Sequence, residues 1–274
     1  MKKKWAAAAA AVVVVVLLVA WFSIRPSVDR VWASDQARQP HAEFDGDIVR
    51  ISNVRNFDHC PATGKTVERW EERTFDLSKL ESVWMTLSLF KKKWRGPAHP
   101  IMSFGFSDST YLAVSVEARR ESHESYATWK GIAKRFELTY VVADEAEIIK
   151  LRTVCRHDRV YLFPIDTSPE KGRKLLREML ERGNELAERP EFYNTIWRNC
   201  TTAVIDHATS VADKPIPGGI HSILPGYSDK VVYSLGLIEG EGSLDEIRAR
   251  YCIDEKAALY ADDPRFSTRI RQGL

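Results

Sequence analysis

The sequence lacks the glycine-rich signatures of nucleotide-binding proteins. Neither a GxxxxGK[ST] phosphate loop nor a GxGxxG dinucleotide motif occurs in the 274 residues, so a nucleotide ligand has no local support. A surplus of one charge is lacking as well. The formal net charge is +2, and the three lysines at residues 2–4 account for more than that, leaving about −1 (2 − 3) for the remainder. Nucleic acid is therefore not expected as a partner.

Cysteine is scarce, and its spacing limits metal and redox chemistry. The chain has four cysteines, far apart and without a C-x-x-C pair: Cys60, Cys155, Cys200 and Cys252. This spacing argues against a zinc ribbon or a thioredoxin-type dithiol, and His99, His123 and Cys155 lack a standard ligand spacing, so we expect no metal and no cofactor. In an oxidising compartment one disulfide among Cys60, Cys155 and Cys252 is plausible, and all three pairings stay open.

Long apolar runs are absent except at the N-terminus. Residues 5–22, WAAAAAAVVVVVLLVAWF, carry no charge and as a helix span roughly 27 Å, close to the hydrocarbon core of a bilayer. A cleaved secretory signal is the alternative, but its apolar region is usually about 7–15 residues long, and the best break, after Ala20, has Leu18 at the minus-three position. We predict an uncleaved single-pass anchor over residues 1–22 in the inner membrane, with the remainder facing the periplasm.

The exported part divides into a tether and one domain. Residues 23–45 contain two prolines and many charges without a sustained period, which predicts a tether, and the domain is expected over 46–274. Alternating apolar residues predict strands within five stretches: 46–57, 82–90, a hairpin over 99–121 with its turn at 107–109, 135–143 and 159–165.

The second half of the domain has helical signals. Ser168 followed by Pro169 is a start signal, and the apolar stripe that follows ends before Pro190. A second helix is predicted from Cys200, and a third from Ser243 with a capping box. Strands followed by helices predict an α+β fold with an antiparallel sheet packed on helices.

Cys200 stands at a predicted helix start and is the candidate nucleophile. Amide dipoles at a helix N-terminus lower the pKa of a thiol from about 8.5 and favour the thiolate, more so beside a histidine. A structural thiol and a disulfide partner are the alternatives. The base has to come from elsewhere in the chain, because His207 lies about two turns further along the same helix.

His99 is the histidine best placed to serve as that base. It precedes a strongly apolar, strand-like run and is therefore expected at a sheet end, where a rigid scaffold holds an imidazole against a helix start. The remaining candidates lie in the tether, in charged turns or in loops: His41, His59, His123, His157 and His221.

Several stretches together resemble a known family. They are NVRNF, AHPIMSFGFSDSTYLAVSVEARRE, RFELTYVVADE followed by Arg152, FYNTIWRNCTTAVIDH and LPGYSDKVVYSLGLI. The chain from about residue 44 to its C-terminus is similar to the bacterial Lnb N-terminal periplasmic domain family. The resemblance implies a thiol-dependent fold akin to papain and the NlpC-type amidases, permuted so that the histidine precedes the cysteine. It also implies transfer of an acyl chain from phospholipid to the amino-terminal cysteine of a lipoprotein.

The resemblance assigns roles to two residues, and two more are candidates from their positions in the sequence. Cys200 would be the nucleophile and His99 the base. Glu117, a charge in an otherwise apolar run, would orient the imidazole, unless Arg119 takes it as an ion pair; Ser115 is another possibility for this role. Backbone amides at the helix start would form an oxyanion hole, with the Asn199 side chain either joining them or capping the helix.

Three functions follow as hypotheses. The first is a membrane-anchored, periplasmic cysteine acyltransferase or hydrolase that forms an acyl-thioester on Cys200, with the bilayer and a phospholipid or lipoprotein as partners. The second keeps the papain-like site but directs it at a peptide bond of the cell wall. The third is a non-catalytic anchored binding module. A narrow polar groove would favour peptide, and a wide apolar one would favour acyl chains.

Overall fold

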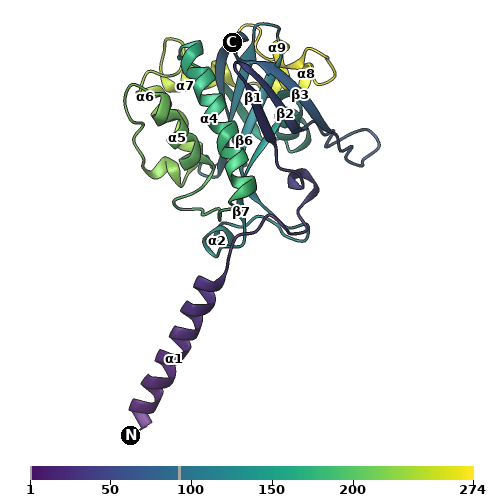
Figure 1. Cartoon of the computed structure of the whole chain (residues 1–274). Coiled ribbons are helices and arrows are strands. Elements are labelled where there is room, and N and C mark those ends of the chain that lie inside the picture. The colour runs from purple at the N-terminus through teal and green to yellow at the C-terminus, as the bar shows by residue number, and fades with distance from the viewer. Residues whose placement is uncertain (1, 92–93) are drawn as a thin grey trace.

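An exposed N-terminal helix projects from an α+β body in this computed structural model, which describes residues 2–91 and 94–274 (Figure 1). Helix α1 spans Lys2–Ser23, and an 18-residue window within Lys3–Ser23 has a mean hydropathy of 2.6 and is not buried in the body. Among the described residues it is the one helix long and apolar enough to cross a membrane. The predicted anchor is thus matched by a separate helix that fits a single membrane span.

Part of the segment predicted as a tether is folded into the body. Gln36, in the 3-10 turn η1 (Ser34–Gln36), is 3% exposed, and β1 (His41–Asp45) pairs antiparallel with the next strand. Trp32 is also buried and stacks on the guanidinium of Arg119. The sequence did not predict this because β1 is short and polar, and its single fully buried residue, Ala42, makes no apolar pattern.

Eight strands of the described chain form one sheet, in the order β1-β2-β7-β6-β5-β4-β8 with β3 paired to β2. Their bounds are β2 Ile48–Arg55, β3 Trp70–Asp76, β4 Leu80–Leu89, β5 Ala98–Phe106, β6 Tyr111–Arg119, β7 Glu137–Asp144 and β8 Arg159–Ile165. The expected antiparallel sheet is corrected in one place: β2 and β7 run parallel, with Arg55 opposite Ala143, so the sheet is mixed. The four intervening strands form the crossover that makes this pair parallel, which periodicity within a single strand does not reveal.

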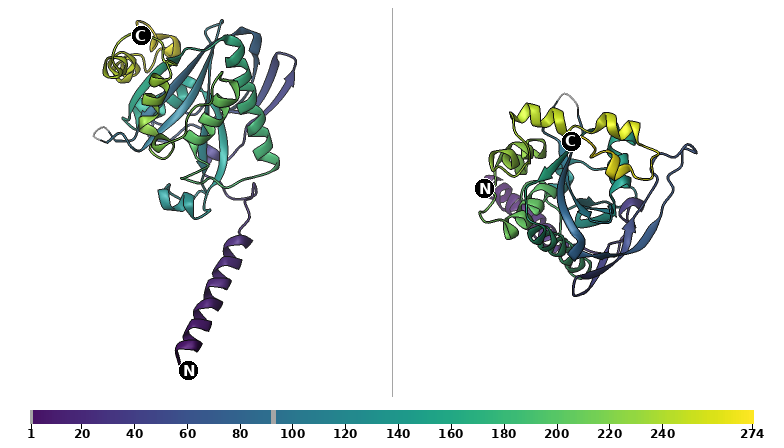
Figure 2. Two further views of the ribbon diagram at one scale, coloured as in Figure 1. Left: turned by 90° about the vertical axis from the view of Figure 1, so that its left-hand side faces the viewer. Right: turned by 90° about the horizontal axis from the view of Figure 1, so that it is seen from above.

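Helices cover both faces of the sheet, as Figure 2 shows. On one face lie α4 (Pro169–Glu188) and α5 (Cys200–Val211), with α6 (Ser228–Ser234) and α7 (Leu244–Tyr251) beside them. The other face is covered by α3 (Glu145–Lys150), the π-helical turn η3 (Leu151–Cys155), α8 (Asp254–Leu259) and α9 (Phe266–Arg269). Because both faces are covered, every residue of β5 is buried.

The predicted helix starts are confirmed by their caps. The Ser168 side chain accepts a hydrogen bond from the Lys171 amide before α4, and Ser243 and Glu246 form the capping box of α7. The hairpin of β5 and β6 also forms, with Ser109 at a φ of 65° in its turn. The short helices α2 (Thr128–Ile132), α3, α8 and α9 were not predicted, because four to six residues give too little periodic signal.

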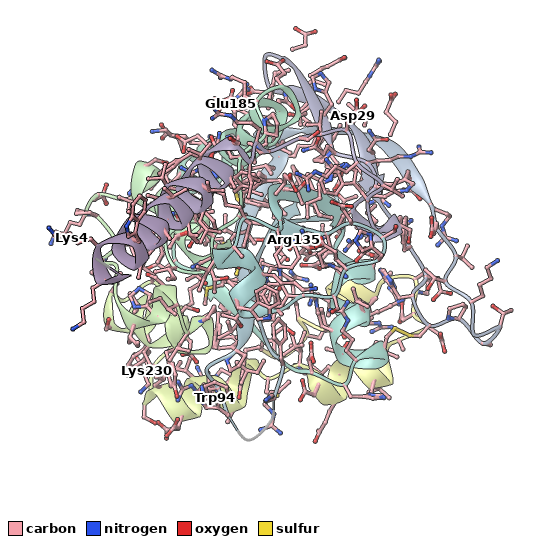
Figure 3. All side chains as sticks on the ribbon, turned by 90° about the horizontal axis from the view of Figure 1, so that it is seen from below. Lys4, Asp29, Trp94, Arg135, Glu185 and Lys230 are labelled. Carbon is pink, nitrogen blue, oxygen red and sulfur yellow. A yellow bond between two sulfur atoms is a disulfide. The ribbon has the colours of Figure 1, made fainter. Side chains whose placement is uncertain are left out.

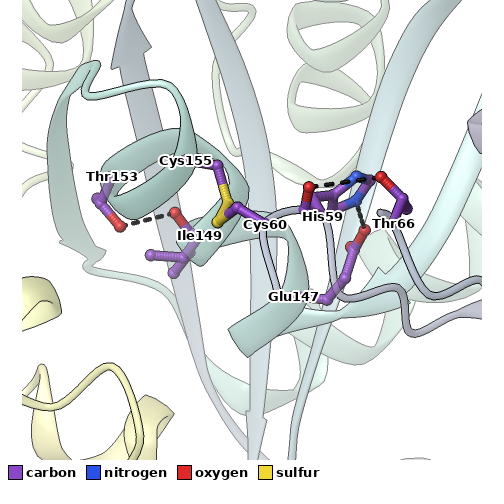
Figure 4. Close-up of a disulfide and its surroundings, with 7 residues drawn as sticks. All are labelled: His59, Cys60, Thr66, Glu147, Ile149, Thr153 and Cys155. Atoms are coloured by element: carbon purple, nitrogen blue, oxygen red, sulfur yellow. Dashed lines mark hydrogen bonds and ion pairs between the residues drawn. A yellow bond between two sulfur atoms is a disulfide. The ribbon is translucent and has the colours of Figure 1, made fainter. Parts of the chain in front are cut away.

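One disulfide, between Cys60 and Cys155, joins the loop after β2 to η3 (Figure 4). This selects one of the three pairings that the sequence left open. It leaves Cys200 and Cys252 as the free cysteines of the described chain.

Candidate active site

A cavity of about 600 Å³ lies at the end of the sheet where β5 begins and β6 ends. We call it the thiol cavity. All four residues predicted for the site line it: Cys200, His99, Glu117 and Asn199. His99 is the histidine among its lining residues, whereas His207 bonds the Tyr140 hydroxyl at 2.7 Å and His59 bonds Glu147 beside the disulfide (Figure 4).

The β5–β6 register brings His99 and Glu117 together. Ile101 pairs with Ser115, so two residues further His99 lies opposite Glu117 and on the same face. The His99 Nε2 atom lies 2.7 Å from the Ser115 hydroxyl, which donates a hydrogen bond to Glu117 Oε1 at 2.9 Å. Since Nε2 is 3.9 Å from Oε1, the contact between imidazole and carboxylate runs through Ser115.

This chain fixes the tautomer of His99. The Ser115 hydroxyl has one proton and gives it to Glu117, so it accepts the Nε2–H of His99. The Nδ1 atom is then the unprotonated nitrogen of the ring, and it has no hydrogen-bond partner among the described residues. His99 is thereby prepared to act as a base through Nδ1.

Glu117 is held as a carboxylate. Burial raises its pKa, but the charges of Arg55 and Arg152 and a 2.7 Å hydrogen bond from Gln36 outweigh burial and keep the pKa below its ordinary value. The Arg152 guanidinium lies 3.7 Å from Oε1. Arg119, the partner considered from sequence, instead donates to the backbone carbonyls of Gln36 and Ala37.

His99 is neutral in this environment. Burial lowers its pKa to about 3, and the Arg152 charge acts in the same direction, while Glu117 opposes it. The imidazole therefore stays unprotonated over the physiological pH range.

Asn199 caps the helix that carries Cys200. Its Oδ1 atom accepts from the amides of Thr201 and Thr202 at 2.9 and 3.0 Å, and its Nδ2 donates to the carbonyls of Thr195 and Ser222 at 2.9 and 2.8 Å. Of the two roles considered from the sequence, helix cap or oxyanion-hole donor, Asn199 therefore has the role of the cap. With all its hydrogen-bonding positions in use, the side chain fixes the first turn of α5 against two loops.

Cys200 is buried and its sulfur is not hydrogen-bonded to His99 within residues 2–91 and 94–274. The Sγ contact is with Thr201 Oγ1 at 3.9 Å. Burial raises the pKa of Cys200 to about 11, and the Thr201 hydroxyl and the amides of Thr201 and Cys200 lower it only in part. The prediction of a lowered pKa for Cys200 is therefore wrong. The amides at the helix start lower the pKa as predicted, but burial raises it by more.

Among the lining residues that were not predicted as site residues are Gln36, Tyr126, Arg152 and Tyr193. Burial raises the pKa of Tyr193 well above its ordinary value, and the neighbouring Cys200 and Tyr126 add to this. Tyr193 and Arg152 lie in or beside the stretches that carried the resemblance, which was the available signal. Gln36 had none, because it lies in a segment without a periodic pattern.

Exposed apolar side chains line the mouth of the thiol cavity on the anchor side of the body. Phe90, Trp94, Tyr126 and Ile223 line the cavity and are each more than 40% exposed. Arg119, at the end of β6, pairs with Glu137, which accepts from Arg30 and Ser27 of the segment after α1. Figure 3 looks at the body from the side where α1 leaves it, and Trp94 lies on this face.

The fold and the cavity define a class: an α+β protein carried on a helix that fits a single-pass membrane anchor, with a free cysteine and a buried histidine lining one cavity. A sequence model described as the Lnb N-terminal periplasmic domain matches residues 66–219, more than half of the chain. The chain belongs to this family, and the match includes His99, Glu117 and Cys200. Searches of curated proteins and of solved structures found no match. The family and the N-terminal helix together describe a periplasmic, membrane-associated protein.

Proposed function

We propose that the protein is a thiol acyltransferase or hydrolase that acts on phospholipid or lipoprotein at the outer face of the inner membrane. The observation that carries the proposal is the thiol cavity, where a free cysteine at a helix start and a histidine with a bare Nδ1 line the same space. As part of it, we propose a permuted papain-like arrangement, because His99 on β5 precedes Cys200 on a helix packed against that strand.

The chemistry begins from a neutral pair. Because the pKa of Cys200 is about 11 and that of His99 about 3, thiol and imidazole are both uncharged at rest. In the substrate complex, where catalytic hydrogen bonds tighten, Nδ1 takes the thiol proton as Sγ attacks the acyl carbonyl. The carboxylate of Glu117 stabilises the resulting imidazolium through Ser115, and His99 then gives the proton to the leaving alcohol.

The second half-reaction uses the same groups. An amine or a water attacks the thioester, His99 accepts the proton of the attacking group, and the proton returns to Sγ when the acyl group leaves. The backbone amide of Cys200 stabilises the oxyanion, since the amides of Thr201 and Thr202 already donate to the Asn199 side chain. Asn199 holds this turn in place as its cap.

The surroundings favour a lipid over a cell-wall peptide. The mouth of the thiol cavity has exposed aromatic side chains and lies on the side of the body joined to the anchor. Aromatic residues suit the interface between membrane and water. The anchor also keeps domain and lipid at a high local concentration.

The test uses the full-length protein in proteoliposomes with acyl-labelled phospholipid and a diacylated lipopeptide acceptor. Wild type and Cys252→Ala, which removes the other free cysteine, are expected to release or transfer label. Cys200→Ala is expected to lose at least roughly 10³-fold in rate. Turnover of lipid by Cys200→Ala would contradict the proposal. Cleavage of cell-wall peptides without any action on lipid would support the amidase alternative instead.

A further inference from the structure

A second cavity, of about 210 Å³, lies between α5 and the sheet, and we call it the apolar cavity. Its walls are mainly aliphatic, with Met85 and Met102 from the sheet and Val204, Ala208 and Val211 from α5. The lining residues of α5 extend from its first turn to its last, over roughly 16 Å. Its shape follows the helix that carries Cys200 at its start.

The two cavities adjoin at the start of α5, where neighbouring residues line one cavity or the other. On α5, Cys200 lines the thiol cavity and Thr201 the apolar cavity. On β5, His99 lines the first and Pro100 the second, because successive residues of a strand face opposite sides. In the loop after α5, Ser222 lines the thiol cavity and His221 lines the apolar cavity.

Two buried polar atoms of the apolar cavity have no partner. His221 Nε2 and Ser228 Oγ make no hydrogen bond among the described residues, and both residues are only 6% exposed. Buried polar atoms are normally paired, since leaving one unpaired is unfavourable. In a mainly aliphatic space they indicate a ligand with an apolar body and a polar group at one end.

We propose that the apolar cavity binds the acyl chain that is transferred or released, with its methylenes along α5 and its carboxyl end at the side where His221 adjoins the thiol cavity. The identity of the chain rests on the proposed function. Thr201 and Pro100 border the end next to the reacting groups, whereas a 2.8 Å ion pair between Lys171 and Asp213, both lining residues, lies where α5 ends. The lining along α5 is roughly 16 Å long, so we expect the cavity to favour acyl chains of a matching length.

Two measurements on the full-length protein in detergent micelles test this inference apart from catalysis. The first uses a non-hydrolysable ether phospholipid with a fluorescent long chain, bound to proteins that carry Cys200→Ala. Adding Ala208→Phe, which fills the cavity, is expected to weaken binding of the long-chain probe at least tenfold and that of a short-chain probe much less. The matched control is Asp206→Phe, on the exposed side of α5, which is expected to bind both probes as before.

The second measurement needs no variant in the core. An ether phospholipid with a photoreactive diazirine at the end of its chain is crosslinked to the Cys200→Ala protein, and the labelled peptides are identified. Labels within residues 204–213 are expected. Labels confined to the cavity mouth, or equal long-chain binding by a folded Ala208→Phe protein, would overturn the inference. If α5 is labelled but the protein shows no thiol-dependent turnover, the proposed function is wrong and the acyl-chain site is still supported.

Discussion

The thiol cavity and the apolar cavity, which adjoin at the first turn of α5, differ in the residues that line them. The thiol cavity is lined by a carboxylate, a neutral imidazole and buried guanidinium groups, each held by named contacts. The apolar cavity is lined by aliphatic side chains, with two polar atoms that have no partner. In the proposed function, the thiol cavity carries out the chemistry and the apolar cavity chooses the acyl chain.

Loss of the base is expected to have the largest effect on this comparison. His99→Ala removes the proton acceptor, so kcat is expected to fall about 10³-fold for long and short acyl chains alike. His221→Ala, in the apolar cavity, is expected to raise KM, with the largest increase for long chains. Steady-state kinetics with a series of chain lengths measures both. Equal losses in the exposed control His123→Ala would show that the effect is not local to the site.

Glu117→Gln tests whether the carboxylate acts through Ser115. The variant keeps the shape but loses the charge that stabilises the imidazolium, so kcat is expected to fall of order 10²-fold with little change in KM. It also removes the counter-charge that lies 3.7 Å from Arg152, and a loss of roughly 3–5 kcal/mol in unfolding free energy is expected. Urea denaturation measures the second effect. An unchanged kcat in a destabilised protein would give Glu117 a structural role alone.

Opening the disulfide is expected to affect the thiol cavity more than the apolar cavity. Cys60 and Cys155 hold η3, which carries Arg152, and they close a loop of 95 residues. The double variant Cys60→Ala, Cys155→Ala is expected to lose about 2–4 kcal/mol of stability. Turnover should fall several-fold, whereas binding of the ether phospholipid should not. Denaturation with and without reductant gives the stability, and a larger loss of lipid binding than of turnover would contradict this division.

The smallest expected effect concerns the pH dependence of alkylation. Burial raises the pKa of Cys200 to about 11, so the thiolate is the minor form at every lower pH. The rate of alkylation by iodoacetamide, which follows the thiolate, should therefore rise about tenfold per pH unit from pH 6 to pH 10. Peptide mass spectrometry follows Cys200 separately from Cys252. A plateau below pH 8 would mean that the thiol is acidic, as the helix start alone predicts.

Local signals in the sequence predicted much of the fold. Strands β2 and β4 to β8 have alternating or fully apolar patterns, and α4, α5 and α7 have stripes with caps, so their period alone identifies them. The same signals placed Cys200 at a helix start and His99 at a strand start. The resemblance added that these two residues belong to one site.

What the sequence did not reveal depends on contacts between distant residues. Gln36 reaches Glu117 from a segment without a pattern, and the choice of Cys60 and Cys155 as a pair follows from tertiary structure. The pKa of Cys200 went opposite to the prediction because burial is a property of the whole fold. The apolar cavity was missed for the same reason, since its walls come from elements far apart in the chain.

The most direct test of the account is to find the acyl group on Cys200. Full-length protein in proteoliposomes is incubated with acyl-labelled phospholipid, quenched in acid and digested with trypsin, and the peptide of residues 199–230 is examined by mass spectrometry. The account predicts an acyl adduct on Cys200 that neutral hydroxylamine removes. Turnover of phospholipid with this peptide unmodified, or with the acyl group on another residue, would contradict it.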